Sequence, residues 1–401
     1  MIPELRKQFN RRWNPARYDE LIRRLEVVSG AHIGFRCSET PIFIPRELLD
    51  KMARFGQELY GQLAANPLYR QASETAIPPE FRVPGNSEDP LFLQADFGLV
   101  HQPDGSLEPK LVELQGFPSI YGFQSVLAET YWDVYRLEEL DAHLTPFLNG
   151  LDEAGYWDLL RRSILNGHSP ENVVLLEIEP QQQKTLPDFL VTKKQLGIKI
   201  ACISEVRKHG RKLYFEGVPI QRIYNRVIVD ELLRKNIQPE FQLTDELDVE
   251  WAGHPNWFFR ISKFSLPWLR HACVPETHFL NEVDPLPENL DDYVLKPLYS
   301  FAGLGVRIGP SREELAAIPG EMRHQYILQR KMNFVPTVTT PSGMTKVEIR
   351  IMYIWENGLR PVTTVLRTGR GPMMGVDFNK NLSWVGASAG FTVTDPSSPK
   401  G

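Results

Sequence analysis

Three side chains with oxygen donors, Asp96, Glu113 and Gln115, stand in a pattern that suits metal and phosphate chemistry. Glu113 and Gln115 are two residues apart, so in an extended strand they share one face while Leu114 points into a core. Asp96 lies in an upstream extended segment. The three can converge as hard oxygen ligands, which suits Mg²⁺ held against phosphates. The competing interpretation is a solvated strand end with ordinary polar side chains, because carboxylates are common at such ends.

A lysine beside a glycine-rich turn forms a second candidate site. Lys296 ends the apolar segment Tyr293-Val-Leu-Lys296, and a turn containing Ser300, Gly303 and Gly305 follows it. An ammonium group next to backbone N–H groups that close over an anion is a common way to hold phosphate. The Walker A pattern GxxxxGK[ST] is absent. A β-hairpin with an edge lysine is the alternative.

Two flanking segments are assigned to the same nucleotide site. Lys263 lies in an aromatic and basic stretch from Trp257 to Arg270. The segment Gln325 to Met332 is predicted to be a strand. We expect the backbone from Leu328 to Arg330 to pair with an adenine edge, which makes Gln329 and Arg330 candidate nucleotide contacts.

The elements that must position these residues follow from periodicity and turn residues. Segments 95–100 and 111–115 are predicted to be paired strands joined by the turn Gln102-Pro-Asp-Gly105, and 346–355 and 360–367 alternate as a second pair around Glu356-Asn-Gly358. A short strand is expected at 32–36, and a long loop with five prolines at 66–90. Helices are predicted at 18–28, 45–64, 124–150 and 156–166.

The middle of the chain has the rhythm of a parallel α/β unit. Strand 172–179, helix 187–197 and strand 198–203 form a β-α-β unit, followed by a hairpin at 212–222 and a helix from Asp230. No GxGxxG follows the first strand, so a usual dinucleotide-binding domain is not expected. Arg226, at a strand end, can hold a substrate carboxylate by two hydrogen bonds. An ordinary salt bridge is the alternative.

Composition limits the functional class. The chain has 401 residues, 42% hydrophobic and 24% charged, with a net charge of −5, which favours a soluble globular protein of two or three domains. This balance predicts neither nucleic acid nor an anionic membrane as a partner. The three scattered cysteines, Cys37, Cys202 and Cys273, favour neither a disulfide framework nor a zinc site. A signal peptide and long apolar runs are lacking, so we expect a cytoplasmic protein.

The order of these motifs resembles a known family. The resemblance is carried by Leu93-Gln-Ala-Asp-Phe-Gly98, Asp104-Gly105 and Lys110-Leu-Val-Glu-Leu-Gln-Gly-Phe-Pro-Ser119, and again by Tyr293-Val-Leu-Lys-Pro297, Gly303-Leu-Gly-Val306 and Tyr326-Ile-Leu-Gln329. The chain is similar, over roughly residues 90 to 390, to the circularly permuted ATP-grasp ligases, above all the synthetase part of glutathionylspermidine synthases. The similarity lies in the pattern rather than in identity.

The resemblance implies an architecture. The fold class is α/β (α+β), an ATP-grasp fold in circularly permuted order with an inserted Rossmann-like α/β substrate domain. Residues 1–165 would hold N-terminal helices and the metal-ligand strands, 166–255 the substrate domain, and 256–401 the nucleotide-binding region, packed with 90–130.

The resemblance also implies a function: an ATP- and Mg²⁺-dependent carboxylate–amine ligase that forms an acyl phosphate on a small-molecule acid. Asp96, Glu113 and Gln115 would bind Mg²⁺, Lys296 would contact ATP phosphates, and Arg367 or Arg370 would contact the transferred phosphoryl group. The partners would be a small-molecule carboxylate and amine, and a homodimer is left open. The alternatives are a nucleotide-binding protein without ligase activity and an ATP-grasp kinase acting on a hydroxyl.

Two departures from the family pattern stand in the site. The family has Asn where Gln115 stands, and Arg where Gln94 stands. The role of that missing arginine would fall to another residue, with Arg36 and Arg82 as the candidates, or would not be filled at all. For this reason polyamine and glutathione specificity are not carried over to this chain.

Overall fold

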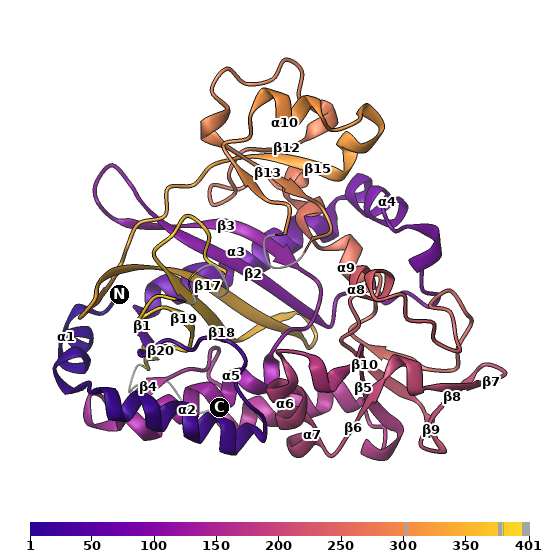
Figure 1. Ribbon diagram of the computed structural model, residues 1–401, viewed down its shortest axis with the longest axis horizontal. Helices are drawn as coiled ribbons and strands as arrows, with labels where there is room; N and C mark the ends of the chain where they lie inside the picture. Colours follow the sequence, from indigo (N-terminus) through magenta and orange to yellow (C-terminus); the bar gives the residue numbers. More distant parts are fainter. Residues whose placement is uncertain (301–303, 376–378, 380, 395–401) are drawn as a thin grey trace.

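A five-stranded path of antiparallel strands forms the centre of the molecule (Figure 1). The computed structural model describes residues 1–300, 304–375, 379 and 381–394. The central sheet has the order β19-β18-β17-β2-β3, and β16 pairs with β17 off this path. Its strands are β2 (Phe92–His101), β3 (Leu107–Gln115), β16 (Val338–Thr340), β17 (Gly343–Trp355), β18 (Leu359–Gly369) and β19 (Gly386–Ser388). Both predicted strand pairs are confirmed, and segments distant in the sequence meet where β17 pairs with β2.

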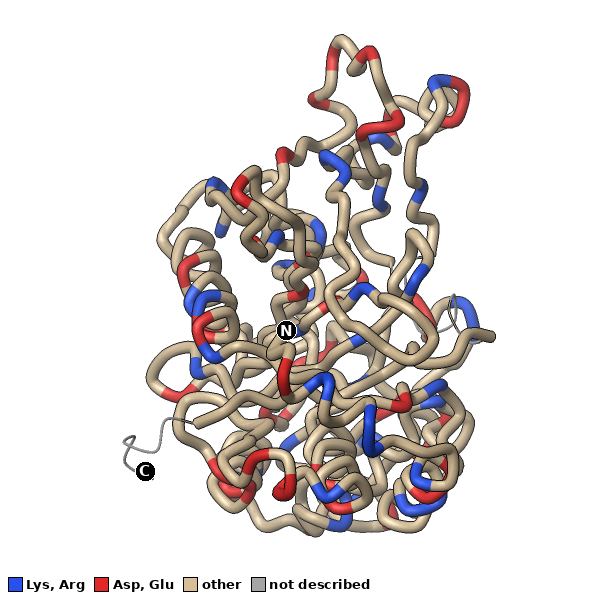
Figure 2. Tube along the Cα trace, turned by 90° about the vertical axis from the view of Figure 1, so that its left-hand side faces the viewer, with Lys and Arg blue, Asp and Glu red and all other residues tan. Residues whose placement is uncertain are grey.

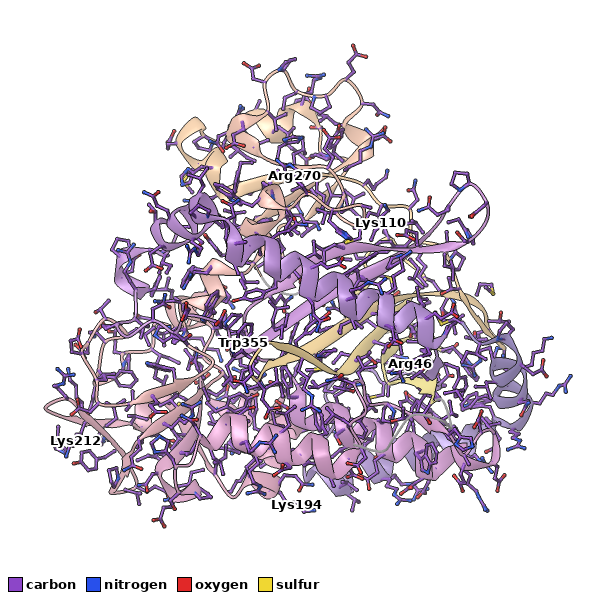
Figure 3. The ribbon with its side chains drawn as sticks, turned by 180° about the vertical axis from the view of Figure 1, so that it is seen from behind. Arg46, Lys110, Lys194, Lys212, Arg270 and Trp355 are labelled. Atoms are coloured by element: carbon purple, nitrogen blue, oxygen red, sulfur yellow. The ribbon has the colours of Figure 1, made fainter. Side chains whose placement is uncertain are left out.

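One face of this sheet is apolar and is covered by the long helix α3 (Arg46–Ala65), as Figure 3 shows from behind. The odd-numbered residues 93–99 of β2 and 347–353 of β17, such as Leu93 and Ile351, are buried there. The approach is close at Gly56, because a Cβ at this position would lie 2.0 Å from the Tyr353 hydroxyl. Because side chains alternate along a strand, the even-numbered residues of β17 project to the opposite face of the sheet, away from α3.

The opposite face is divided into two halves. Phe92, Met352 and Val365 pack against α5 (Tyr121–Tyr135) and α6 (Glu153–Leu165) in an apolar cluster. The other half carries polar side chains, described with the candidate site.

The predicted parallel α/β unit is confirmed. Its sheet has the order β11-β10-β5-β6, with strands β5 (Val173–Glu177), β6 (Lys199–Cys202), β10 (Arg222–Asn225) and β11 (Glu250–Ala252), all parallel. Helix α7 (Leu186–Leu196) makes the crossover from β5 to β6. A small antiparallel sheet, β7 (Arg207–His209), β8 (Lys212–Phe215) and β9 (Val218–Ile220), contains the predicted hairpin, and α8 (Val229–Arg234) follows β10.

A separate four-stranded sheet lies beyond β3, at the top of Figure 1. Its order is β12-β15-β13-β14, from β12 (Thr277–Phe279), β13 (Tyr293–Pro297), β14 (Arg307–Ile308) and β15 (Tyr326–Arg330). Leu295 and Leu328 pack on one face with Leu315 of α10 (Arg312–Ala316). Lys296 and Ile327 are paired on the other face.

The remaining elements surround this frame. Helices α1 (Pro3–Arg12) and α2 (Pro15–Ser29) pack near α5, and α9 (Trp257–Arg260) lies between β11 and the four-stranded sheet in sequence. A second three-stranded sheet joins β1 (Ile42–Phe43), β20 (Gly390–Val393) and β4 (Leu144–Thr145). No helix among the described residues is long and apolar enough to cross a membrane. Figure 2 shows acidic and basic residues interleaved along the trace.

Three predictions about local structure are wrong. The loop predicted at 66–90 contains α4 (Pro67–Thr75), whose first turn is capped by the Asn66 side chain; Pro at the first helical position suits that start. Segment 32–36 forms no strand. The helix predicted at 124–150 ends at Tyr135, because Arg136 takes a left-handed conformation with φ 52°. The domain boundaries near 165 and 255 stay predictions.

Candidate functional site

The polar half of the central sheet gathers charged residues from four strands, and we call this group the polar cluster. Asp96 pairs with Glu113 on one side and with Arg350 on the other, while Glu348 pairs with Arg367. Residues directly opposite in a sheet project to the same face, so the register alone brings these side chains together. The predicted convergence of Asp96 and Glu113 is thus seen in the strand pairing.

Asp96 is the buried centre of the polar cluster. Its carboxylate accepts from Arg350 Nε at 2.6 Å and Arg350 Nη2 at 2.7 Å, which is a bidentate pair. Arg367 Nη2 donates to the same carboxylate at 2.7 Å and also to Glu348. The side chain of Asp96 is 1% exposed. Two guanidinium groups therefore neutralise one buried carboxylate.

The Glu113 side chain, on β3, contacts a lysine from outside the central sheet and an amide from its own strand. Lys263, the first residue of a 3₁₀ segment (Lys263–Trp268), places Nζ 3.2 Å from Glu113 Oε2. The Gln115 amide donates to the other carboxylate oxygen. Burial alone would raise the pKa of Glu113, but the cations Lys263, Arg350, Lys296 and Arg367 outweigh it and lower the pKa to about 2. Glu113 is consequently an anion across the physiological pH range.

Lys296 reaches the polar cluster from the four-stranded sheet. Its Nζ donates to the Val112 carbonyl of β3 at 3.1 Å. Burial is the largest influence on Lys296 and lowers its pKa to about 8, with Glu113 opposing the shift and nearby Lys263 adding to it. Lys263 likewise donates to a carbonyl, that of Ser300, at 2.7 Å. Each of these two ammonium groups thus has a backbone carbonyl as a hydrogen-bond partner.

The charge of the assembled cluster is positive. Four cations (Lys263, Lys296, Arg350 and Arg367) face three carboxylates (Asp96, Glu113 and Glu348), which leaves one positive charge. Burial raises the pKa of Glu348, although Arg367 opposes this. Burial would lower the pKa of Arg367, but Glu348 and Asp96 outweigh it and raise that pKa. Such an excess of buried cations favours an anionic ligand.

Glu348 and Arg350 were missed by the sequence analysis. The strict alternation of segment 346–355 was the available signal, since it puts Glu348 and Arg350 on the face opposite Ile349 and Ile351. Arg350 brings a guanidinium next to Asp96, which the family pattern expects from position 94. Arg36 instead donates to Tyr18 at 3.2 Å and pairs with Glu39. Arg82 donates to the carbonyls of Glu74 and Ile77, so neither predicted substitute is seen at Asp96.

The backbone of β15, which we predicted to pair with an adenine edge, is already used within its own sheet. β15 is an interior strand, paired with β12 on one side and β13 on the other, so its edge groups are already hydrogen-bonded. Gln329 shares the face of Lys296 but is buried and donates to Thr277 Oγ1 at 3.0 Å. Arg330 points to the opposite face, where it lies over the Tyr293 ring. Alternation therefore separates Arg330 from Lys296.

The predicted phosphate loop is described in part. Ser300 contributes its carbonyl to Lys263, and Gly305 has φ 74° with Pro297 2.8 Å from where a Cβ would stand. Gly303 lies outside the described residues. A small cavity beside this segment is lined in part by Glu113, Gln115, Phe117, Lys263, Tyr299 and Ser300.

The three predicted catalytic arginines have different surroundings. Arg367 lies in the polar cluster. Arg370 follows β18, and its Nε and Nη2 atoms are buried without a hydrogen-bond partner among the described residues. Arg226 is 4% exposed and pairs with buried Asp188 at 2.6 Å, and Asp188 also accepts from the Phe123 N–H near the start of α5. In this structure Arg226 forms the ordinary salt bridge that was the alternative interpretation, and a substrate carboxylate would have to displace Asp188 to bind it.

The predicted metal ligands, as arranged, do not fit a divalent cation. Mg²⁺ requires free carboxylate oxygens and usually keeps several waters. Both oxygens of Asp96 are held by guanidinium groups, and Glu113 is held by Lys263 and Gln115. Among the described residues, no group of three or more His, Cys, Asp and Glu side chains is arranged to hold a metal ion.

The fold and the site thus define a mixed α/β protein with a cationic cluster between two sheets. No family model matches the sequence, and no curated protein matches it. Among solved structures, the chain is similar to a glutathione synthetase-like effector from Globodera pallida in its apo form. The TM-score is 0.57 at 10% identity, and the similarity covers 94% of this chain and 99% of that chain. At this identity the similarity shows a fold of the glutathione synthetase-like kind, while the circular permutation stays a prediction.

Proposed function

We propose that the polar cluster and the facing four-stranded sheet bind ATP, and that the protein is an ATP-dependent carboxylate–amine ligase. One observation supports this most strongly. Lys263 and Lys296 approach the central sheet from outside, and Arg350 and Arg367 project from within it, so four cations surround one region. Phosphoryl transfer requires charge neutralisation and alignment rather than a covalent protein group. The glutathione synthetase-like fold agrees with this class of chemistry.

The proposed reaction has two steps. A carboxylate oxygen of the acid attacks the terminal phosphorus of ATP, the P–O bond to the leaving phosphate breaks, and ADP departs with its electron pair. An amine then attacks the acyl phosphate carbon, inorganic phosphate leaves, and the amine nitrogen gives up a proton. Lys296 and Lys263 would neutralise the polyphosphate, and Arg367 would stabilise charge on the transferred group.

A second candidate is a nucleotide-binding protein without ligase activity. The observation that favours it is the set of hydrogen bonds that engages both oxygens of Asp96, since a family ligase would present that carboxylate to Mg²⁺. Binding of ATP without turnover is the outcome that separates it from the ligase.

The experiment measures ADP release with ATP, MgCl₂ and pooled small carboxylic acids and amines. A ligase sustains ADP release over many turnovers only when both an acid and an amine are present, because the acid alone carries the reaction no further than the acyl phosphate. ATP binding is measured in parallel for Lys296→Ala, which should lose about tenfold or more in affinity, the loss of one charged contact. The matched control is Lys194→Ala, an exposed residue of α7 labelled at the lower edge of Figure 3, which should bind ATP as the wild type does. Unchanged ATP binding by Lys296→Ala would overturn the assignment of this site.

A further inference from the structure

We infer that Asp96 is an internal counter-ion for Arg350 and Arg367 rather than a metal ligand, and that the site binds a polyphosphate through protein cations without a divalent ion. The inference rests on the proposed binding of ATP at the polar cluster. It differs from the expectation of the family resemblance, in which Asp96, Glu113 and Gln115 bind Mg²⁺.

The geometry of Asp96 is that of a satisfied ion pair. The two nitrogens of Arg350 each take one carboxylate oxygen, and Arg367 adds a third donor to Oδ2. The Asp96 side chain is 1% exposed, so no solvent face remains for a hydrated cation. Mg²⁺ loses its waters reluctantly, and two arginines would repel it from this position.

The other two predicted ligands are engaged as well. Glu113 accepts from the Gln115 amide on one oxygen and lies 3.2 Å from Lys263 on the other. Gln115 therefore uses its amide N–H toward Glu113. The extra methylene relative to Asn gives the side chain the reach for this contact within one strand.

The two lysines have hydrogen-bond partners that a phosphate oxygen can replace, unlike the two arginines. Arg350 and Arg367 are fixed by carboxylates, whereas Lys296 and Lys263 also hold the carbonyls of Val112 and Ser300. Phosphate oxygens can replace a carbonyl at an ammonium group with a gain in charge pairing. Asp96 then orients the arginines, and the lysines receive the polyphosphate.

The test is calorimetric titration of the whole chain with ATP in buffer containing EDTA and in buffer containing excess MgCl₂. We expect binding in EDTA at least as tight as with Mg²⁺, because free ATP carries more negative charge toward the four cations. Inorganic tripolyphosphate should also bind in EDTA. An affinity lower by about tenfold or more in EDTA would overturn the inference and leave the proposed function standing. Absence of ATP binding in both buffers would refute both.

Two variants separate an anchor from a ligand. Asp96→Asn should keep or tighten ATP binding in EDTA, since it removes one negative charge from the site. A metal ligand would instead lose affinity for ATP in MgCl₂ by about tenfold or more. Circular dichroism checks that the variant is folded. Gln115→Met removes the amide oxygen without removing a charge, so it supplies the same test if Asp96→Asn does not fold: unchanged affinity in MgCl₂ supports the inference, and a loss of that size overturns it.

Discussion

The ion pairs of Asp96 allow a stability prediction that can be worked from the structure. Asp96→Asn keeps the size of the side chain but removes its charge and replaces one acceptor oxygen by an amide donor. Three hydrogen bonds of 2.6–2.7 Å from two guanidinium groups are affected. The amide can still accept from one of them. The substitution therefore leaves at least one donor of a buried arginine facing another donor.

Removing one partner of a buried ion pair costs about 3–5 kcal/mol of unfolding free energy. Arg350 is 10% exposed and has no carboxylate partner besides Asp96 among the described residues. Arg367 is 26% exposed and keeps Glu348, so its share of the loss is smaller. We therefore expect Asp96→Asn to lower the free energy of unfolding by about 3 kcal/mol, the lower end of that range.

The matched control is Asp50→Asn. Asp50 also pairs with an arginine, Arg46, but at the surface of α3, with side chains 53% and 40% exposed. Exposed pairs of this kind contribute about 0.5 kcal/mol. Urea unfolding followed by far-UV circular dichroism measures both variants against wild type. If Asp96→Asn costs no more than Asp50→Asn, the description of Asp96 as a buried anchor is refuted.

Three further outcomes are expected. Burial holds the pKa of Lys296 at about 8, so its charge is lost above that pH, and ATP affinity measured by calorimetry should fall from neutral pH to about pH 9.5. The free energy of unfolding should instead increase as pH rises above 8, because the unfolded lysine keeps its proton to a higher pH than the folded one. An ATP affinity independent of pH would contradict this role of Lys296. In urea unfolding, Gly56→Ala should lower the free energy of unfolding by about 1–3 kcal/mol, because its Cβ would lie 2.0 Å from the Tyr353 hydroxyl. Gly61→Ala in the same helix, with nothing within 4 Å of its Cβ, should raise the free energy of unfolding by about 0.5–1 kcal/mol. Equal effects of the two substitutions would refute the close approach at Gly56. Asp188→Ala should cost about 3–5 kcal/mol, because a buried guanidinium loses its partner, and a loss below about 1 kcal/mol would show that this pair is not structural.

The local part of the fold was predictable from the sequence. Alternation identified β2, β3, β17 and β18, and the strand–helix–strand rhythm of the middle of the chain identified the parallel strands β5 and β6. These patterns are reliable because the side-chain direction in a strand depends only on the residue's own backbone. The same rule placed Glu113 and Gln115 on one face before any partner strand was known. The prediction from sequence failed at residues 66–75, where the number of prolines indicated a loop but the structure has a capped helix.

What surrounds each of those side chains was decided by the tertiary structure. Arg350 meets Asp96 across 254 residues of sequence, and this contact depends on the register of β17 against β2. Likewise, the place of β15 between two strands, and not its composition, closes its backbone to a ligand. A carboxylate at a strand end has the same sequence signature whether it faces a metal or a guanidinium. Only the long-range pairing of strands shows that Asp96 faces two arginines.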